Sequence, residues 1–364
     1  MELELIKTDM TPKQRAYAYA RGERVDRIPC NLTAGETASL IYGIDICDYY
    51  FSSEAMVTVE EGLARDTGAD NMGMGLGLRT LAEAVGTEMS YPKDNVSSVK
   101  TPAFATPSDV ESAELVDIHK DGRLPIMLEA FKVLIDRHGE ERNVGTGSAG
   151  PLTLASNILG TKQLLKSFIK DKEGAKKVLQ YSTNVIIKVA KDLWDEFGIS
   201  FSLAEPMASK YLLRKSSFEE FCLPYLKQCI DAISSCQGGC SLHICGETKD
   251  RWDDIVGLGI NGFWCDNCES MLELKQKYGD KIAITGNIPP VDVVLYGTEA
   301  DINESVKKIL LEAADSPSGF CLCPGCTTPV GTPLENMVAI MNAAATFGKG
   351  AVKGKLPEGL AAFL

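Results

Sequence analysis

Positive charge is scarce in this sequence. Its 37 lysines and arginines stand against 50 aspartates and glutamates, so the formal net charge is −13 at pH 7. Proteins that bind nucleic acids or anionic membranes need a basic face that neutralises phosphate groups. We therefore expect no nucleic acid and no membrane surface as a partner, and instead a small molecule or another protein.

Long apolar runs and a targeting signal are missing as well. The first ten residues are mixed and acidic, without the basic segment and apolar core of a secretory leader. No apolar run approaches the roughly 18 residues that a membrane span needs. We expect a cytoplasmic protein, whose 12 cysteines are thiols or metal ligands rather than disulfides.

Short apolar runs alternate with helical patterns along the chain. The runs, read as strands, are Arg27–Leu32, Asp70–Gly77, Asn143–Pro151, Ile199–Pro206, Gly239–Gly246, Ile260–Asn267, Lys281–Asn287 and Ser318–Gly325. The helical patterns are Leu164–Leu179, Asn184–Phe197, Phe218–Ser234, Thr248–Leu258, Met271–Tyr278, Asp301–Ala314 and Leu334–Phe347. This alternation predicts an α/β protein with a closed (β/α)8 barrel, the TIM-barrel fold. No Gly-x-Gly-x-x-Gly follows the first run, which disfavours an open dinucleotide-binding sheet.

Two regions depart from the regular alternation. A helix before Arg27 is predicted from Thr11 as its N-cap and Pro12 at its first position. We expect it to pack outside the barrel as an N-terminal extension. The Pro- and Ser-rich stretch 90–124 reads as an elaborated loop on the barrel rather than a second domain. The expected organisation is thus a single domain over residues 1–364.

One of the three histidines stands two residues before a cysteine, in "CSLHICGET". Residues i and i+2 of a strand face the same way, so His243 and Cys245 can share one metal ion. Alone, the pair favours a core position over a ligand site, since free cysteine is often buried. Active sites of such barrels lie at the carboxyl ends of the strands. The later strand ends supply four possible third ligands, among which spacing does not choose: Cys265, Cys268, Cys323 and Cys326.

Other polar residues follow the same strand ends. Glu205 and Asp266 are candidate catalytic groups, either as a transient fourth ligand or in orienting a substrate; the alternative is hydrogen bonding to loop backbone. Asn287 and Tyr211 are candidate substrate-binding residues, although Asn287 also suits a tight turn. Cys265-x-x-Cys268 is alternatively a redox pair or part of a closed zinc site.

Taken together, these segments resemble a known family. "SLHICGETKDRWDDIVGLGINGFWCDN", "AITGNIPPVDVVLYGT" and "CLCPGCTTPVGTPLENMVAIMNAA" are similar to the uroporphyrinogen decarboxylase superfamily, in particular its zinc-dependent corrinoid methyltransferases. "TPKQRAYAYARGERVDRIPCNL" resembles the start of that family. The resemblance implies a (β/α)8 barrel, zinc held by His243, Cys245 and Cys326, and a partner protein that carries a corrinoid (cobalamin) cofactor.

The resemblance therefore implies an enzyme that moves a methyl group between a corrinoid protein and a small molecule. That molecule is a thiol, tetrahydrofolate or a methylated donor such as a methoxyaromatic. Two alternatives stay open: a uroporphyrinogen decarboxylase, and a non-catalytic accessory protein that binds zinc or corrinoid. Cys30 stands where the decarboxylases have an arginine, and Thr327 and Thr328 replace a glycine and small apolar residues after Cys326.

Overall fold

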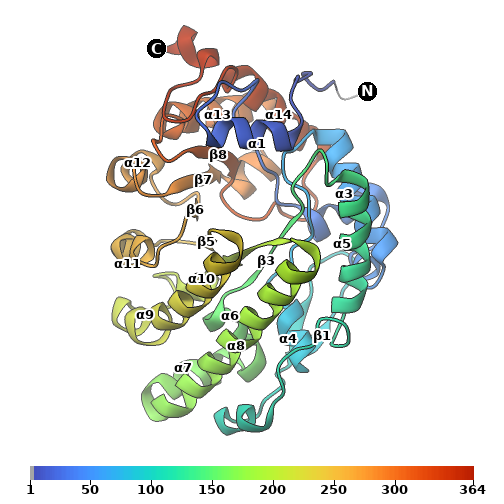
Figure 1. Cartoon of the computed structure of the whole chain (residues 1–364), viewed down its shortest axis with the longest axis vertical. Helices are drawn as coiled ribbons and strands as arrows, with labels where there is room; N and C mark the ends of the chain where they lie inside the picture. The colour runs from blue at the N-terminus through green and yellow to red at the C-terminus, as the bar shows by residue number, and fades with distance from the viewer. Residues whose placement is uncertain (1–3) are drawn as a thin grey trace.

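The structure, a computed structural model, describes residues 4–364. Its centre is a parallel sheet in which consecutive strands are neighbours, as Figure 1 shows. The strands are β3 (Gly145–Ala149), β4 (Ser200–Ala204), β5 (Ser241–Ile244), β6 (Gly262–Cys265), β7 (Ala283–Ile288) and β8 (Phe320–Pro324). Sequential order with every strand parallel is the arrangement that right-handed crossover helices produce.

Two further extended segments close the sheet into a barrel. Cys30 pairs in parallel with Leu322 of β8, and Met72 pairs in parallel with Val144 just before β3. The two segments join each other, since the Asp70 N–H donates to the Cys30 carbonyl at 3.0 Å. The first two predicted strands are therefore present as isolated bridges rather than full ladders, the second with a further bridge from Gly77 to Ser148. The predicted TIM barrel is confirmed.

Helices cover the outside of this ring (Figure 1). They are α1 (Pro12–Ala20), α2 (Ile46–Tyr50), α3 (Ser53–Thr67), α4 (Thr80–Val85), α5 (Leu124–His138), α6 (Pro151–Leu159), α7 (Thr161–Lys170), α8 (Lys172–Phe197), α9 (Lys215–Phe221), α10 (Leu223–Gln237), α11 (Trp252–Gly257), α12 (Met271–Tyr278), α13 (Glu299–Ala313) and α14 (Leu334–Phe347). Within residues 4–364, no helix combines the length and apolar character required to cross a membrane.

Three predicted helices have different boundaries in the structure. The pattern Thr248–Leu258 is a 3-10 turn, η4 (Lys249–Arg251), followed by α11. The helix expected to start at Asn184 starts at Lys172, because the Asp171 side chain accepts the Gly174 N–H and caps a new helix there. The helix expected over Phe218–Ser234 is split at Cys222 into α9 and α10. Pro224 explains the split, since proline lacks the N–H that a continuous helix needs and is tolerated in a first turn.

The N-terminal extension packs on the barrel beside β8. Thr11 and Gln14 form a reciprocal capping box at the start of α1, as expected for Thr11 and Pro12. From the end of α1, the Tyr19 hydroxyl accepts the Phe320 N–H at 3.2 Å. Figure 1 shows α1 near α13 and α14, at the same end of the molecule as both termini.

The irregular stretch 90–124 is a decoration of the barrel, as predicted. β1 (Glu88–Ser90) and β2 (Ser98–Thr101) pair as an antiparallel hairpin. A short 3-10 helix, η2 (Pro107–Ser112), follows and packs against α8. The stretch ends where α5 begins, so it leaves the barrel ring uninterrupted.

Candidate metal centre

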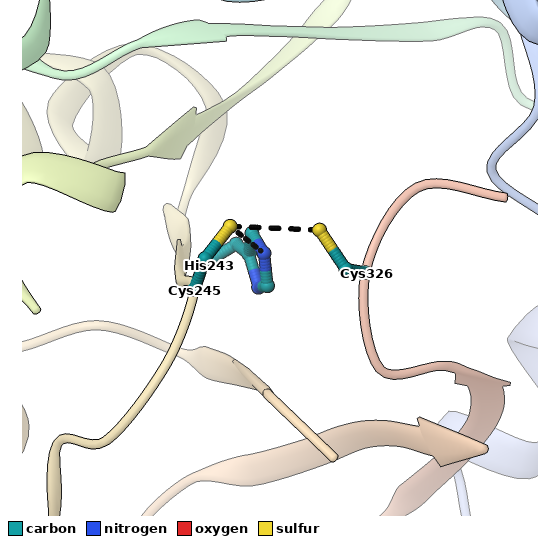
Figure 2. Close-up of side chains that lie close together, drawn as sticks. All are labelled: His243, Cys245 and Cys326. Atoms are coloured by element: carbon teal, nitrogen blue, oxygen red, sulfur yellow. Dashed lines mark hydrogen bonds between the residues drawn. The ribbon is translucent and has the colours of Figure 1, made fainter. Parts of the chain in front are cut away.

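Three side chains from two separate strand ends meet at the carboxyl-terminal mouth of the barrel. His243 lies in β5, Cys245 directly follows it, and Cys326 follows β8. His243 Nε2 lies 3.1 Å from Cys245 Sγ, and the two sulfur atoms are 3.5 Å apart (Figure 2). All three potential ligand atoms lie within 4.8 Å of one another. The barrel thus brings the His-x-Cys pair to one of the four candidate cysteines.

The donor atoms and their spacing fit a zinc ion. Zinc binds imidazole nitrogen at about 2.0–2.1 Å and thiolate sulfur at about 2.3 Å. Tetrahedral bonds of that length separate two sulfur atoms by about 3.8 Å, and the observed separation is 3.5 Å. The side chains need to spread by a few tenths of an ångström. Three protein ligands then leave the fourth position free for a substrate atom.

Hydrogen bonding sets the orientation of the His243 ring. Its Nδ1 lies 2.9 Å from the Trp264 carbonyl on β6. A carbonyl can only accept, so Nδ1 carries the proton and Nε2 presents its lone pair to the sulfur atoms. The Trp264 ring lies against the imidazole with centroids 4.1 Å apart, and its indole N–H donates to the Pro324 carbonyl at 2.7 Å. Trp264 therefore ties the histidine of β5 to the end of β8.

The two thiols of the group differ in acidity. The pKa of Cys326 is lowered, mainly because the Cys245 thiol donates to it, with His243 adding to the effect. The pKa of Cys245 is raised, because its proton is held in that hydrogen bond, and by burial. The hydrogen bond between the two sulfur atoms thus favours the ionised form of Cys326 and the protonated form of Cys245. A dication would displace the Cys245 proton, since thiolates are the metal-binding form.

Asp266 shapes the turn that carries Cys245. Its Oδ2 accepts the Gly246 N–H at 2.8 Å, and its Oδ1 accepts the Cys268 N–H at 3.0 Å. Gly246 has a φ of +81°, and a Cβ there would lie 2.6 Å from the Ser209 hydroxyl oxygen. Glycine is required at this position because of both the conformation and the close contact. The Asp266 carboxylate thus links the ends of β5 and β6.

Glu205 is fully buried and bound to the first turn of α6. Its carboxylate accepts the N–H groups of Leu152 and Thr153 at 2.9 and 2.8 Å, and the Thr153 hydroxyl. Burial raises the pKa of Glu205 to about 7, and these hydrogen bonds oppose the shift. Its own N–H donates to the His243 carbonyl at 2.8 Å. The contacts are those of the backbone-bonding alternative considered for this residue.

The structure also separates the other two candidates from the metal group. The Asn287 amide donates to the carbonyls of Asp266 and Glu269, both at 3.0 Å, and so holds the loop after β6. Tyr211 lies on the rim of the mouth, where its side chain is 68% exposed. A Cβ on Gly246 would touch the Tyr211 ring at 2.8 Å. Tyr211 therefore covers the turn after Cys245 from the solvent side.

The three remaining cysteines of the strand ends lie outside the group. Cys265 is fully buried, Cys268 is exposed and Cys323 is buried beside Thr33. All twelve cysteines are free, so Cys265 and Cys268 form no disulfide. Of the four candidate cysteines, the structure thus brings Cys326 to the His-x-Cys pair, which is the cysteine that the family resemblance implies.

Sequence reasoning missed two features of the site. The first is Trp264, which directly follows Phe263 in an apolar run and carries no motif of its own. The second is a cavity of about 700 Å³ that runs from His243 and Cys326 into the barrel. Glu60 on α3 lies in its wall, far from the strand ends in sequence. Trp264 pairs with His243 in the parallel register of β5 and β6. The available signal was the alternation of side chains along each strand, which puts two paired residues on the same face of the sheet.

Several known methyltransferases are similar to this chain in sequence and in structure over nearly its whole length. A methylcobamide:CoM methyltransferase of Methanosarcina acetivorans is 27% identical over 345 residues, covering 93% of this chain and 99% of that protein. A methylated-thiol–coenzyme M methyltransferase of Methanosarcina mazei is 26% identical over 340 residues, covering 92% of this chain and 89% of that protein. The solved structure of a methyltransferase from Methanosarcina mazei superposes with a TM-score of 0.81 at 27% identity, over 92% of this chain and 98% of that chain.

The family comparison agrees with these relatives and with the resemblance seen in the sequence. The family described as uroporphyrinogen decarboxylase (URO-D) matches residues 11–347, which is nearly the whole chain. The match spans the barrel and all three residues of the metal-binding geometry. The chain belongs to the uroporphyrinogen decarboxylase family, and within it resembles the methylcobamide:CoM methyltransferases.

Proposed function

We propose that this protein is a zinc-dependent methyltransferase that moves a methyl group between the cobalt of a corrinoid protein and a small molecule. The observation that carries the proposal is the group of His243, Cys245 and Cys326, whose nitrogen and two sulfur atoms lie within 4.8 Å of one another. Relatives named methylcobamide:CoM methyltransferases that match over more than nine-tenths of this chain support it.

Each residue has a defined task in this proposal. His243 offers Nε2 because its Nδ1 proton is held by the Trp264 carbonyl. Cys245 and Cys326 offer thiolates. When bound, zinc would supply Lewis acidity to a thiol or an ether oxygen in the fourth position. Asp266 is a positioning residue, since its carboxylate holds the turn after Cys245. The cavity beside the three ligands receives the small molecule, and the corrinoid protein approaches from solvent at the mouth.

The cavity argues against decarboxylation of a porphyrinogen. Such a substrate carries several carboxylates, which a binding site must neutralise with cations. No lysine or arginine lines the cavity, and all the lining residues fall within the described chain. The family name alone therefore does not determine the reaction of this chain.

Metal content and methyl transfer test the proposal together. Purified protein is expected to contain about one zinc per chain. It should also consume methylcobalamin with a thiol acceptor, or form it from cob(I)alamin and a methylated donor. His243→Ala and Cys326→Ala are expected to lose both zinc and activity, because each removes one of three ligands.

Two cysteine variants serve as controls. Cys236→Ala removes a half-buried thiol near the end of α10, and Cys268→Ala removes the exposed thiol after β6. Both are expected to keep zinc and activity. Loss of zinc in Cys268→Ala would point instead to a closed four-ligand site. Zinc without methyl transfer to or from any cobalamin would favour a non-catalytic accessory protein.

A further inference from the structure

The cavity next to the metal group reaches the opposite wall of the barrel. Its volume is about 700 Å³, and its lining includes His243 and Cys326 at one end. The segment between the first two strands supplies the other wall, with Glu36 on η1 (Gly35–Tyr42), Tyr49 on α2 and Glu60 on α3. A molecule whose one end lies at His243 and Cys326 can thus place its other end near Glu36 and Glu60.

Small side chains keep this space open. Barrel interiors of this fold are usually filled by bulky branched residues. Here three neighbouring strand segments contribute glycine and serine to the lining instead: Gly73, Gly75, Gly77, Gly145, Gly147, Ser200 and Ser202. The cavity therefore results from the small residues of the strands themselves, and its volume is in the range of small-molecule binding sites.

Glu60 is the unusual group in its wall. Its side chain is 5% exposed, and Oε1 has no hydrogen-bond partner among residues 4–364. Oε2 accepts the Gly73 N–H at a long 3.4 Å. A Cβ on Gly35 would lie 3.6 Å from both Glu60 Oε1 and the Tyr49 hydroxyl oxygen, so these polar atoms share one corner of the cavity. A buried carboxyl oxygen without a partner is costly unless a ligand supplies one.

No positively charged side chain compensates the buried carboxyl group of Glu60. Burial raises the pKa of Glu60 to about 8, with the Gly73 N–H opposing it and no arginine or lysine acting on it. The neighbouring carboxylate Glu36 differs, because it bonds to Tyr50 and feels the positive charges of Arg123 and Arg79.

The remaining acidic group of the lining is already neutralised. Asp70 forms ion pairs with Arg15 and Arg27, at 2.7 Å for Arg27. Both arginines are buried and neither lines the cavity. Among the acidic lining residues, Glu60 is therefore the one with space in front of it and no cation beside it.

We propose that the cavity binds a substrate whose end remote from the metal carries a positive charge, of the ammonium class, with Glu60 as its counter-ion and the Tyr49 hydroxyl beside it. This inference rests on the proposed function, because it assumes that the reacting end faces His243, Cys245 and Cys326. An ammonium N–H supplies the missing partner of Oε1 in a charge-assisted hydrogen bond. An ammonium group favours the ionised form of Glu60 and so becomes its counter-ion. An anionic substrate such as a sulfonate thiol would instead keep Glu60 protonated, and it finds no cation in the lining.

A series of thiols that differ in one end group tests the inference. The probes are alkanethiols of matched chain length that end in an ammonium, a hydroxyl or a sulfonate group. Their affinity for zinc-loaded protein is measured by titration calorimetry. The ammonium thiols are expected to bind roughly tenfold to a hundredfold more tightly than the hydroxyl thiols, the range for a hydrogen bond to a charged group. The sulfonate thiols are expected to bind weakest.

Variants connect that preference to Glu60. Glu60→Gln keeps the shape of the side chain and removes its ability to ionise, so the ammonium preference should disappear while zinc content stays the same. Glu196→Gln is the matched control, because Glu196 pairs with His119 on the surface, where both side chains are about half exposed. It should leave the ranking unchanged. Equal affinity of ammonium and hydroxyl thiols for the wild-type protein overturns the inference, whether or not the Glu60 variant folds.

A metal-independent pair separates this inference from the proposed function. n-Butylammonium and its neutral analogue butan-1-ol are titrated into His243→Ala, which lacks a ligand but keeps Glu60. Tighter binding of n-butylammonium there supports the subsite even if the metal hypothesis fails. If the protein binds zinc and transfers methyl groups, but the charged and neutral probes bind equally well, the ammonium subsite is refuted and the proposed function is retained.

Discussion

The role of Glu205 gives the sharpest prediction, because the sequence made it a catalytic candidate and the structure surrounds it with backbone. Glu205→Ala removes the acceptor of two buried N–H groups and one hydroxyl in the first turn of α6. Each unpaired buried donor costs about 1–3 kcal/mol. With some relaxation of the turn, we expect the free energy of unfolding to fall by about 3–5 kcal/mol.

Glu205→Gln tests the charge of the same group. The pKa of Glu205 is raised from 4.5 to about 7 by burial. The folded state therefore binds more protons than the unfolded state between those pH values, and stability falls as pH rises through this window. Two to three pKa units at 1.36 kcal/mol each correspond to about 3 kcal/mol. Wild type should lose about this much relative to Glu205→Gln between pH 4.5 and pH 8.

Urea unfolding at several pH values measures both effects. The midpoint and the slope of each transition are recorded, so that a change in stability is distinguished from a change in cooperativity. Glu60 also has a raised pKa and also makes stability fall as pH rises. Because Glu60 is present in both proteins, the difference in unfolding free energy between wild type and Glu205→Gln reports on Glu205 alone. Zinc content per folded chain should be equal in wild type and Glu205→Gln.

Two results would refute this reasoning. If wild type gained stability over Glu205→Gln as pH rose, the hydrogen bonds would be holding the carboxylate ionised against burial. If Glu205→Gln kept wild-type stability at every pH but lost methyl transfer, Glu205 would act on the substrate rather than on α6.

The remaining predictions concern the mouth of the barrel. Trp264→Phe keeps an aromatic ring against His243 but loses the N–H that donates to Pro324; we expect zinc affinity, measured by competition with a chelator, to fall about tenfold. Zinc binding to the metal-free protein at neutral pH should release about one proton, from the Cys245 thiol, which calorimetry in buffers of different ionisation enthalpy detects. Tyr211→Ala removes an exposed side chain from the rim; it should raise KM for the corrinoid protein severalfold and leave the rate with free methylcobalamin unchanged. An equal loss with both methyl carriers would place Tyr211 in the small-molecule site instead.

The positions of the predicted strands and of the His-x-Cys pair follow from local patterns. Apolar runs bounded by turn residues locate all eight strand segments, even though those around Cys30 and Met72 form isolated bridges. Errors occurred where a local signal was overlooked: Asp171 caps α8 and Pro224 divides α9 from α10. Period-two alternation correctly put His243 and Cys245 on one side of β5, because that property depends on the strand alone.

Contacts between distant segments decided the rest. Residue spacing could not select Cys326 from four cysteines, because the loop after β8 must cross the mouth to bring its sulfur within 3.5 Å of Cys245. Likewise, nothing near Glu60 in the sequence indicates that α3 turns its carboxyl into the cavity beside the metal group. The sequence by itself therefore determined the fold and the chemical types of the ligands, through patterns that span a few residues. The family resemblance implied Cys326, and the tertiary structure brings its sulfur to the His-x-Cys pair. Which charge the cavity presents was decided by the tertiary structure alone, since it depends on segments that meet only when the barrel closes.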